Sequence, residues 1–327
     1  MTRFKWGILG PGLIAQKFAT GVKALKDAQI YAVASRSPER ANAFADQYGA
    51  PKRYGSYTEL ANDPDVDAIY IATPNTLHLE HTTLCLKAGK PVLCEKPFTM
   101  NAGEAEKSIA CARTENVFLM EAMWTRCLPI YDTVRKWIDN GEIGDVQIVK
   151  GDFGFREVWP DEDRHANMSI GGGALIDIGV YPIALAYMVF GGPPTKAKAV
   201  AYFYGTGADR QTAILLGYEK GQMALMACTF DTPMYDEAWI YGTKGQIRIP
   251  FFWRATSATL MRDGREVDST SAPFLANGYE YEAIEAMKCI REGKKESPRI
   301  RLEETLQIVR TMDQLRAEIG LRYPCEN

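Results

Sequence analysis

The first third of the chain alternates short apolar runs with segments whose apolar residues recur at helical spacing. The apolar runs predict strands at 4–9, 29–35, 68–72, 91–94 and 118–120. The segments between them predict helices at 13–25, 38–48, 57–61, 78–88 and 101–116. Buried strands joined by helices favour a parallel sheet covered on both faces, and such sheets bind ligands beyond the carboxyl ends of their strands.

The pattern changes after Trp124, where strands follow one another without helices between them. We predict strands at 146–155, 196–204, 211–218, 222–229, 238–241, 246–249 and 258–261, and helices at 131–140, 173–190, 280–292 and 302–319. Successive strands without crossover helices indicate a mainly antiparallel sheet. The sequence therefore predicts an α/β protein in which a nucleotide-binding domain (residues 1–122) precedes an α+β domain (residues 123–327).

Composition excludes several classes of protein. The 327 residues are 46% hydrophobic and 24% charged, and the net charge of -3 gives no sign of a nucleic-acid footprint or an electrostatic membrane anchor. The sequence has no run of 18 apolar residues and no signal-peptide pattern, so we expect no transmembrane helix. The seven cysteines are dispersed without a Cys-x-x-Cys pair, which favours reduced thiols of a cytoplasmic protein over disulfides or a zinc site.

A glycine-rich turn follows the first predicted strand. Gly10-Pro11-Gly12-Leu13-Ile14-Ala15 fits G-x-G-x-x-A and opens a helix, the context in which this pattern indicates dinucleotide binding. The first glycine permits a tight turn, the second lets a pyrophosphate approach the backbone, and the helix N-terminus offers free N–H groups. We predict cofactor contacts at Gly10, Gly12, Leu13 and Ile14. The alternative is an ordinary strand-to-helix turn.

The end of the second strand, Ser35-Arg36-Ser37, indicates which dinucleotide binds. NAD-specific sites usually place an acidic residue here to bind the ribose 2′-hydroxyl, and this chain has none at that point. The Arg36 guanidinium suits a 2′-phosphate instead. We therefore predict NADP in preference to NAD, with contacts from Ser35 and Arg36. The alternative is a solvent-exposed arginine at a helix start.

Two further loops follow predicted strands and hence face the same crevice. The segment TPNTLH (residues 73–78) lies where the nicotinamide half of a dinucleotide passes, or is a turn with a helix cap. The second loop is Glu95-Lys96-Pro97, where the lysine is placed to hydrogen-bond substrate or cofactor, or is an ordinary surface lysine. The predicted cofactor contacts in these loops are Thr73, Pro74, Asn75, His78, Glu95 and Lys96.

A second glycine-rich segment, GGGALIDIGVY (residues 171–181), lies in the later part of the chain. Asp177 and Tyr181 are four residues apart, a spacing that puts two side chains on one face of a helix. A tyrosine near a cationic lysine serves as proton donor to a carbonyl or as acceptor from an alcohol. The alternative is a glycine-rich loop that caps a core helix, with Tyr181 only packed.

The motifs GPGLIA, TPNTLH, CEKP and GGGALIDIGVY, in this order, resemble those of the glucose–fructose oxidoreductase/inositol dehydrogenase/rhizopine-catabolism (Gfo/Idh/MocA) family over nearly the whole chain. The resemblance implies an N-terminal Rossmann domain and a C-terminal domain with a large open sheet that commonly forms the interface of a homodimer. It also implies that Lys96 lies at the nicotinamide, and that Asp177 and Tyr181 lie in the substrate site.

Within the family, the segments YGSYTELANDPDVD, AGKPVLCEKP, FLMEAMWTR and GGGALIDIGVY are similar to the branch of dimeric dihydrodiol dehydrogenases, also described as NADP-dependent D-xylose dehydrogenases. Many family members have histidine at the position of Tyr181, and the tyrosine here matches this branch. His78 and Trp124 match positions that line its pocket. Asn75 departs from the branch, which has a second histidine there.

These observations predict an enzyme in which NADP(H) exchanges hydride with an alcohol or carbonyl carbon of a sugar, polyol or dihydrodiol. Tyr181 exchanges the hydroxyl proton, Lys96 assists it and Asp177 orients the substrate. Residues expected around the substrate from their neighbourhood alone are Trp124, Arg126, Phe153, Phe155 and Arg156. One alternative is a regulatory or redox-sensing NADPH-binding protein, which needs neither Lys96 nor Tyr181, and another is a lyase with tightly held NAD. No metal, nucleic-acid or membrane partner is predicted.

Overall fold

The computed structural model describes residues 3–326, and its contacts divide the chain into two compact units. The first unit runs to Cys127 and also includes Phe274–Leu306. The second unit comprises Leu128–Pro273 and the residues from Gln307 onward. Segment 274–306, which the sequence analysis assigns to the second domain, thus belongs to the first unit.

The return of the chain to its first unit has a packing cause. Helix α8 (Glu280–Arg291) packs against α1 (Leu13–Lys23), and Arg291 pairs with Asp27 at 2.7 Å. A boundary drawn along the sequence cannot describe such a return. The functional boundary between residues 122 and 123 stays a prediction.

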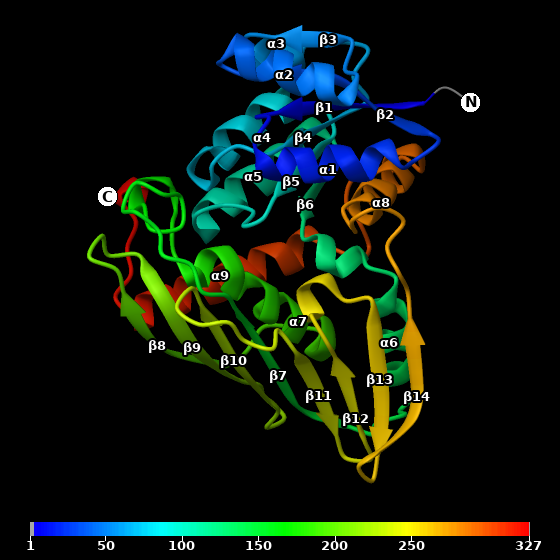
Figure 1. Cartoon of the computed structure of the whole chain (residues 1–327), viewed down its shortest axis with the longest axis vertical. Coiled ribbons are helices and arrows are strands. Elements are labelled where there is room, and N and C mark those ends of the chain that lie inside the picture. The colour runs from blue at the N-terminus through cyan, green and yellow to red at the C-terminus, as the bar shows by residue number, and fades with distance from the viewer. Residues whose placement is uncertain (1–2, 327) are drawn as a thin grey trace. The chain divides into compact units, whose positions relative to one another are not determined.

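The first unit is built on a six-stranded parallel sheet in the order β3-β2-β1-β4-β5-β6 (Figure 1). The order reverses between β1 and β4, where a doubly wound sheet opens a crevice at the carboxyl ends of its strands. The elements are β1 (Phe4–Leu9), β2 (Ala28–Ala34), α2 (Pro38–Tyr48), β3 (Lys52–Tyr54), α3 (Tyr57–Ala61), β4 (Ala68–Ile71), η1 (Asn75–Leu77), α4 (His78–Lys87), β5 (Val92–Glu95), α5 (Ala102–Glu115), β6 (Leu119–Ala122) and η2 (Trp124–Cys127), with α1 and α8 as above.

Aromatic packing in the core of the first unit holds α1, the helix that follows the glycine turn, in place. Strands β4, β5 and β6 are buried at every position, as expected of strands covered on both faces. Phe18 of α1 stacks on Tyr70 of β4 with ring centroids 3.8 Å apart, and meets Trp6 of β1 edge-on at 5.1 Å. These rings hold α1 against the two central strands.

The second unit is built on an eight-stranded sheet in the order β14-β13-β12-β11-β7-β10-β9-β8 (Figure 1). Its described pairs are antiparallel apart from β7 with β10. Helix α7 packs against β7 and β10, and α6 packs against β13 and β14. The elements are α6 (Ile130–Asp139), β7 (Val146–Gly154), η3 (Met168–Ile170), η4 (Leu175–Gly179), α7 (Val180–Phe190), β8 (Lys196–Phe203), β9 (Asp209–Gly217), β10 (Met223–Thr229), β11 (Ala238–Gly242), β12 (Gln246–Ile249), η5 (Phe252–Arg254), β13 (Ser257–Arg262), β14 (Arg265–Ser271) and η6 (Pro324–Glu326); α9 (Leu302–Glu318) is shared by both units.

The predicted fold class is confirmed, with three local differences. Strand β3 has three residues and β14 is exposed along nearly its whole length, so neither shows an apolar pattern and both escape prediction. The predicted helix at 173–190 begins as a π-helical turn, η4, before it continues as α7. Asp177 therefore lies in the π-helical turn and Tyr181 in the first turn of α7.

One stretch of the described chain, Met168–Phe190, is long and apolar enough to cross a membrane. Within its most apolar 18-residue window, 83% of the residues are buried inside the structure. Burial on this scale is the pattern of a core helix, which passes the same test of length and composition.

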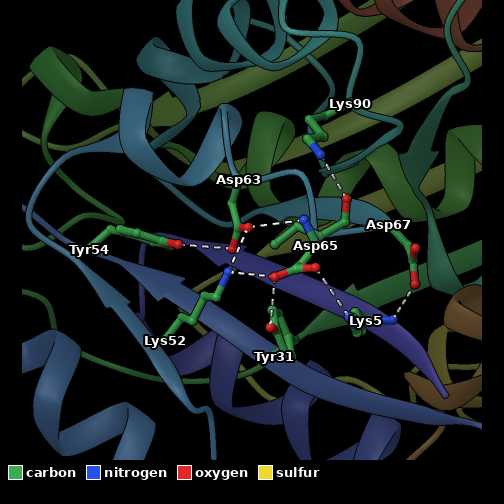
Figure 2. Close-up of polar contacts among 9 residues, drawn as sticks. Lys5, Tyr31, Lys52, Tyr54, Asp63, Asp65, Asp67 and Lys90 are labelled. Carbon is green, nitrogen blue, oxygen red and sulfur yellow. Dashed lines mark hydrogen bonds and ion pairs between the residues drawn. The ribbon is translucent and has the colours of Figure 1, made fainter. Parts of the chain in front are cut away.

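A charged network beside β2 and β3 holds the loop that enters β4 (Figure 2). The buried carboxylate of Asp63 accepts hydrogen bonds from Lys52 Nζ at 2.8 Å, the Tyr54 hydroxyl at 2.9 Å and the Asp65 N–H at 3.0 Å. Tyr31 donates to Asp65 at 3.2 Å. Burial alone would raise the pKa of Asp63, but these donors hold it below its ordinary value of 3.8. The network stabilises a loop that precedes a strand, not the loops that follow strands.

We expect Tyr54→Phe to lower the free energy of unfolding by about 1–2 kcal/mol at pH 7, because a buried carboxylate loses a donor. The depressed pKa of Asp63 means that its stabilising contribution is present above about pH 4 and is lost as the pH falls through the folded-state value. The difference between variant and wild type should therefore shrink below about pH 4. Urea unfolding at neutral and acidic pH measures both effects.

Tyr31→Phe is the matched control, because its hydroxyl donates to the exposed carboxylate of Asp65. This variant should change the free energy of unfolding little. Equal losses in the two variants, or a Tyr54→Phe difference that persists in acid, would contradict the assignment.

Candidate active site

The turn after β1 has the geometry that a dinucleotide-binding turn needs. Gly10 has a φ of 91°, and a Cβ there would lie 2.9 Å from Thr73 Cγ2, so glycine is required on both counts. At Gly12, a Cβ would meet, among the described residues, the Ala72 carbonyl alone, at 3.9 Å. Packing within the chain therefore does not explain glycine at position 12, whereas the approach of a pyrophosphate group does.

Helix α1 presents an N-terminus suited to phosphate. Among residues 3–326 no side chain caps it, and its first turn contains no acidic residue. Leu13 is 81% exposed and Ile14 is half-buried, while Ala15 is fully buried against the sheet. The first-turn N–H groups and the positive end of the helix dipole thus fit the phosphates of a dinucleotide.

Arg36 is exposed at the carboxyl end of β2. The hydroxyls beside it serve the loop itself: Ser35 Oγ accepts from the Ser37 N–H at 3.2 Å, and Ser37 caps α2. The pKa of His81 is lowered first by burial and further by the charge of Arg36. The charge of Glu80 opposes this effect on the pKa of His81. His81 lies in α4, and its ring bonds the Thr73 hydroxyl in the loop after β4 at 2.9 Å.

His78 connects the loops that follow β4 and β5. Its ring is fully buried, and its two nitrogens each lie 2.9 Å from a carbonyl oxygen, those of Pro97 and Thr73. Burial lowers the pKa of His78 to about 4, against the two carbonyls, which favour the protonated ring. His78 thus positions the backbone on both sides of the crevice, and its predicted contact with the cofactor remains a prediction.

Lys96 stands directly after β5 and is half-buried. Its N–H donates to Glu95 Oε2 at 3.0 Å, and Glu95 also accepts from the Tyr70 hydroxyl. A second buried acid, Glu282 of α8, has a pKa raised well above 4.5 by burial and by the charge of Glu95. Through the bond from the Lys96 N–H, the Glu95 carboxylate holds the main chain at Lys96 in place.

Two residues expected around the substrate lie in the interior of the first unit. Trp124 is buried and stacks on Tyr279 with ring centroids 4.4 Å apart. Arg126 donates to the Glu304 carboxylate and, at 3.1 Å, to the Arg299 carbonyl. Both side chains hold segment 274–306 in place, and their predicted contacts with substrate remain untested.

Asp177 and Tyr181 are both buried in the second unit, where η4 passes into α7. The Tyr181 ring lies 5.6 Å from that of Phe153 and 6.4 Å from that of Trp253, which stack on each other at 4.7 Å. The Arg164 guanidinium lies 3.4 Å from Asp177 Oδ1. The phenol thus lies among aromatic rings, and the carboxylate four residues before it lies beside a guanidinium.

The aromatic cluster continues into the loop after β7. The Phe155 ring lies 6.2 Å from Phe153 and 5.2 Å from Phe230, whereas Arg156 is exposed. This loop also carries a residue that the sequence analysis missed, His165, whose Nε2 lies 3.7 Å from Asp177 Oδ2. The signal available in the sequence is slight: His165 is one of 3 histidines in the chain.

The structure groups the predicted site residues within each unit. The predicted cofactor residues lie in the first unit, and Asp177, Tyr181 and the phenylalanines lie in the second. Lys96 and Tyr181 belong to different units, so their joint action on one substrate stays a prediction.

A parallel sheet in this strand order, with an open glycine turn after β1 and a lysine after β5, defines a dinucleotide-binding protein. Residues 4–123 match the family model described as "Oxidoreductase family, NAD-binding Rossmann fold", and residues 131–248 match the "GFO/IDH/MocA C-terminal domain". The chain is thus an oxidoreductase of the nicotinamide-dinucleotide class. It belongs to the GFO/IDH/MocA family, as its motifs predict.

Relatives are similar along the whole chain. Trans-1,2-dihydrobenzene-1,2-diol dehydrogenase of Xenopus tropicalis is 37% identical over 329 residues, which cover 98% of this chain and 99% of that protein. The Homo sapiens protein of the same name is 36% identical over 330 residues, or 98% of each chain. A 3-ketoreductase from Actinomadura kijaniata, solved with NADP and TDP-benzene, has a TM-score of 0.86 at 27% identity, covering 97% of this chain and 98% of that one. Aldose-aldose oxidoreductase from Caulobacter crescentus shares the fold, with a TM-score of 0.88 at 23% identity over 97% of this chain and 98% of that one.

Proposed function

We propose that this chain is an NADP-dependent oxidoreductase that transfers hydride between nicotinamide and an alcohol or carbonyl carbon of a sugar, polyol or dihydrodiol. The observation that carries the proposal is the position of Lys96, which follows β5 at the same sheet edge as the open glycine turn. The names of its relatives support it: dihydrodiol dehydrogenases match over the full length, and a structural neighbour is a ketoreductase solved with NADP.

The cofactor fits residues of the first unit. The phosphates would be held by Gly10, Gly12, Leu13 and Ile14, and the 2′-phosphate by Ser35 and Arg36. The nicotinamide half would be held by Thr73, Pro74, Asn75, Glu95 and Lys96. His78 would support that half by bonding the backbone carbonyls of Thr73 and Pro97. Bound NADP supplies the acceptor or donor of hydride. The chain itself must then move one proton at the substrate oxygen.

We assign that proton to Tyr181. Its phenol donates the proton when a carbonyl is reduced, and its phenolate accepts one when an alcohol is oxidised. The Lys96 ammonium stabilises negative charge on the phenol oxygen or the substrate oxygen, and Asp177 accepts hydrogen bonds from substrate hydroxyls and so orients them. Structures of the Actinomadura kijaniata ketoreductase include variants in which a lysine is replaced by alanine and a tyrosine by phenylalanine.

We expect Tyr181→Phe and Lys96→Met each to lower kcat by roughly 10²–10⁴-fold, the usual contribution of a general acid–base group. The measurement is NADP reduction with a panel of aldoses and trans-diols, combined with titration of NADPH binding. The Tyr181→Phe variant should still bind NADPH with unchanged affinity, because the cofactor residues lie in the first unit.

Tyr187→Phe is the matched control, because Tyr187 lies on the same helix and its hydroxyl is bonded to the Gln307 carbonyl and to Thr311. It should cost stability but leave kcat unchanged. Activity that survives both Tyr181→Phe and Lys96→Met would overturn the mechanism. NADPH binding without turnover of any substrate by the wild type would favour the regulatory alternative.

The preference for NADP has a separate test. Arg36→Asp should weaken NADPH binding by roughly 10–100-fold, because a charge-assisted contact is replaced by repulsion, and should change NADH binding little. Arg113→Asp makes the same charge change at an exposed position on α5 and should affect neither cofactor. Isothermal titration of both cofactors measures this, and an equal loss for NADPH and NADH would exclude a contact with the 2′-phosphate.

We further propose that the chain forms a homodimer through the outer face of the eight-stranded sheet. Leu215 of β9 pairs directly with Leu225 of β10, and the two side chains are 46% and 41% exposed. Val200 and Tyr202 on β8 and Met223 on β10 are exposed on the same face. Lys198 of β8 and Lys150 of β7 flank this leucine pair on the same face. Exposed apolar side chains gathered in this way mark an interaction site, and a second copy presenting the same face gives a closed twofold dimer.

We expect Leu215→Lys to convert the dimer to a monomer, because it removes an apolar contact and places a further positive charge beside Lys198 in the proposed interface. Val267→Lys, at an exposed position on the edge strand β14, is the control and should leave the dimer intact. Sedimentation velocity measures the mass of each variant. A wild-type chain that sediments as a monomer would refute the proposal.

We also propose a cytoplasmic location. Five cysteines are buried thiols, which suits a reducing compartment: Cys85, Cys94, Cys127, Cys228 and Cys289. Cell fractionation tests this location.

A further inference from the structure

His165 lies between two carboxylates in the second unit. Its Nδ1 is 2.6 Å from Asp163 Oδ1, which also accepts from the His165 N–H at 2.9 Å. Its Nε2 is 3.7 Å from Asp177 Oδ2. The imidazole therefore joins a loop carboxylate to the acid that the proposed function assigns to substrate orientation.

The ring is held in this orientation from both sides. Trp159 stacks on it with centroids 3.8 Å apart and an interplanar angle of 21°, and Phe230 meets it edge-on at 5.4 Å and 82°. The residue is buried. Because the faces are packed and Nδ1 is bonded, the direction in which Nε2 points is fixed.

The protonation state of the ring decides what Nε2 offers. Burial lowers the pKa of His165 below its ordinary value of 6.5, with help from Arg164 and against the charges of Asp177 and Asp163. The ring is therefore neutral at pH 7, and its single hydrogen sits on Nδ1, where Asp163 accepts it. Nε2 then presents a lone pair beside the Asp177 carboxylate, so two acceptors face each other across 3.7 Å.

Building on the proposed function, we propose that His165 is a specificity-determining residue whose Nε2 and the Asp177 carboxylate together accept hydrogen bonds from two adjacent, non-reacting hydroxyl groups of the substrate. The class of substrate follows from the number of hydroxyl donors that it presents. Adjacent hydroxyls present two donors side by side, which two neighbouring acceptors satisfy at once. A trans-dihydrodiol keeps a single non-reacting hydroxyl, whereas an aldose or polyol carries an adjacent pair. The arrangement therefore selects sugars over dihydrodiols.

The test couples a change in the protein to a change in the substrate. His165→Phe keeps an aromatic ring between Trp159 and Phe230 but removes the acceptor, and His165→Gln restores an acceptor near the position of Nε2. Each chain is assayed with NADP on D-xylose, D-glucose, their monodeoxy analogues and a trans-dihydrodiol. The free energy of unfolding and the affinity for NADPH are measured in parallel.

In the wild type, removing the recognised hydroxyl should lower kcat/KM by roughly 10–100-fold, because a buried acceptor loses its partner. In His165→Phe the same removal should cost less than about threefold, since the acceptor is already gone. His165→Gln should recover part of the preference for the full sugar. Turnover of the dihydrodiol should fall far less than turnover of the sugars in both variants, because a dihydrodiol has no second non-reacting hydroxyl for Nε2 to accept from.

Three other outcomes would overturn the inference, and they differ in what they leave of the proposed function. A merely structural role would lower kcat/KM for sugars, deoxysugars and the dihydrodiol by one common factor, which overturns the inference. Turnover of dihydrodiols without turnover of sugars also overturns it, and leaves the proposed function standing. Absence of turnover with every substrate overturns the proposed function and the inference together.

The pH profile supplies a second readout. The charged groups that face His165 are Asp163, Asp177 and Arg164, and the rings of Trp159 and Phe230 are uncharged. Protonation in acid turns Nε2 into a donor toward Asp177, so KM for the sugar should rise in the wild type as the pH falls through the pKa of His165, which burial holds below its ordinary value of 6.5. The rise should be absent in His165→Phe, and an identical acid limb in both chains would overturn the inference.

Discussion

Parallel pairing of β1 with β2 and with β4 is the constraint from which the first unit follows. Parallel strands end at a common edge, so the loops after them gather there whatever sequence they carry. The register shows this directly, because Leu9 pairs with Ala34 and with Ile71, and Ile71 pairs with Cys94. The glycine turn, the arginine after β2 and the lysine after β5 each follow these residues within a few positions. The fold thus sets the place of the site, and the side chains in the loops set what it binds.

The elements of this unit could be predicted because their signals are local. An apolar run, a capping serine or a glycine after a helix acts within a few residues, and the predicted bounds agree with the structure within a few positions. The return of segment 274–306 could not be predicted, because an amphipathic helix shows which face is buried but not what buries it. In the structure, α1 is the partner that buries α8, and the two helices approach closely: a Cβ at Gly21 of α1 would lie 2.7 Å from the N of Glu280, at the start of α8.

The candidate site shows the same difference between local signals, which could be predicted, and contacts between distant residues, which could not. The motifs correctly placed residues at the ends of strands, yet they carry no information about partners that are distant in the sequence. His78 is a bridge between two backbone segments, and Arg126 bonds Glu304, which is 178 residues away. His165 lies in a loop with no motif, and its contact with Asp177 depends on the aromatic rings that orient it. Such roles are defined by packing, so they appear only when the chain is folded.

The turn that carries Asp177 is held in place at a cost to stability. Asp209 is fully buried, and its Oδ2 accepts from the Leu175 N–H and the Thr212 hydroxyl, both at 2.7 Å. Burial raises the pKa of Asp209 from 3.8 to about 6, so the ionised carboxyl destabilises the folded chain progressively as the pH rises through that range. A shift of this size corresponds to roughly 3 kcal/mol at neutral pH. The negative charge nevertheless suits the positive N-terminal end of the helix, where an apolar residue would leave the Leu175 N–H without its acceptor. A Cβ at Gly173 would lie 2.3 Å from Asp209 Oδ1, and φ there is 135°, so the buried acid and the backbone both require glycine at this position. Through the Leu175 N–H, Asp209 holds the backbone two residues before Asp177.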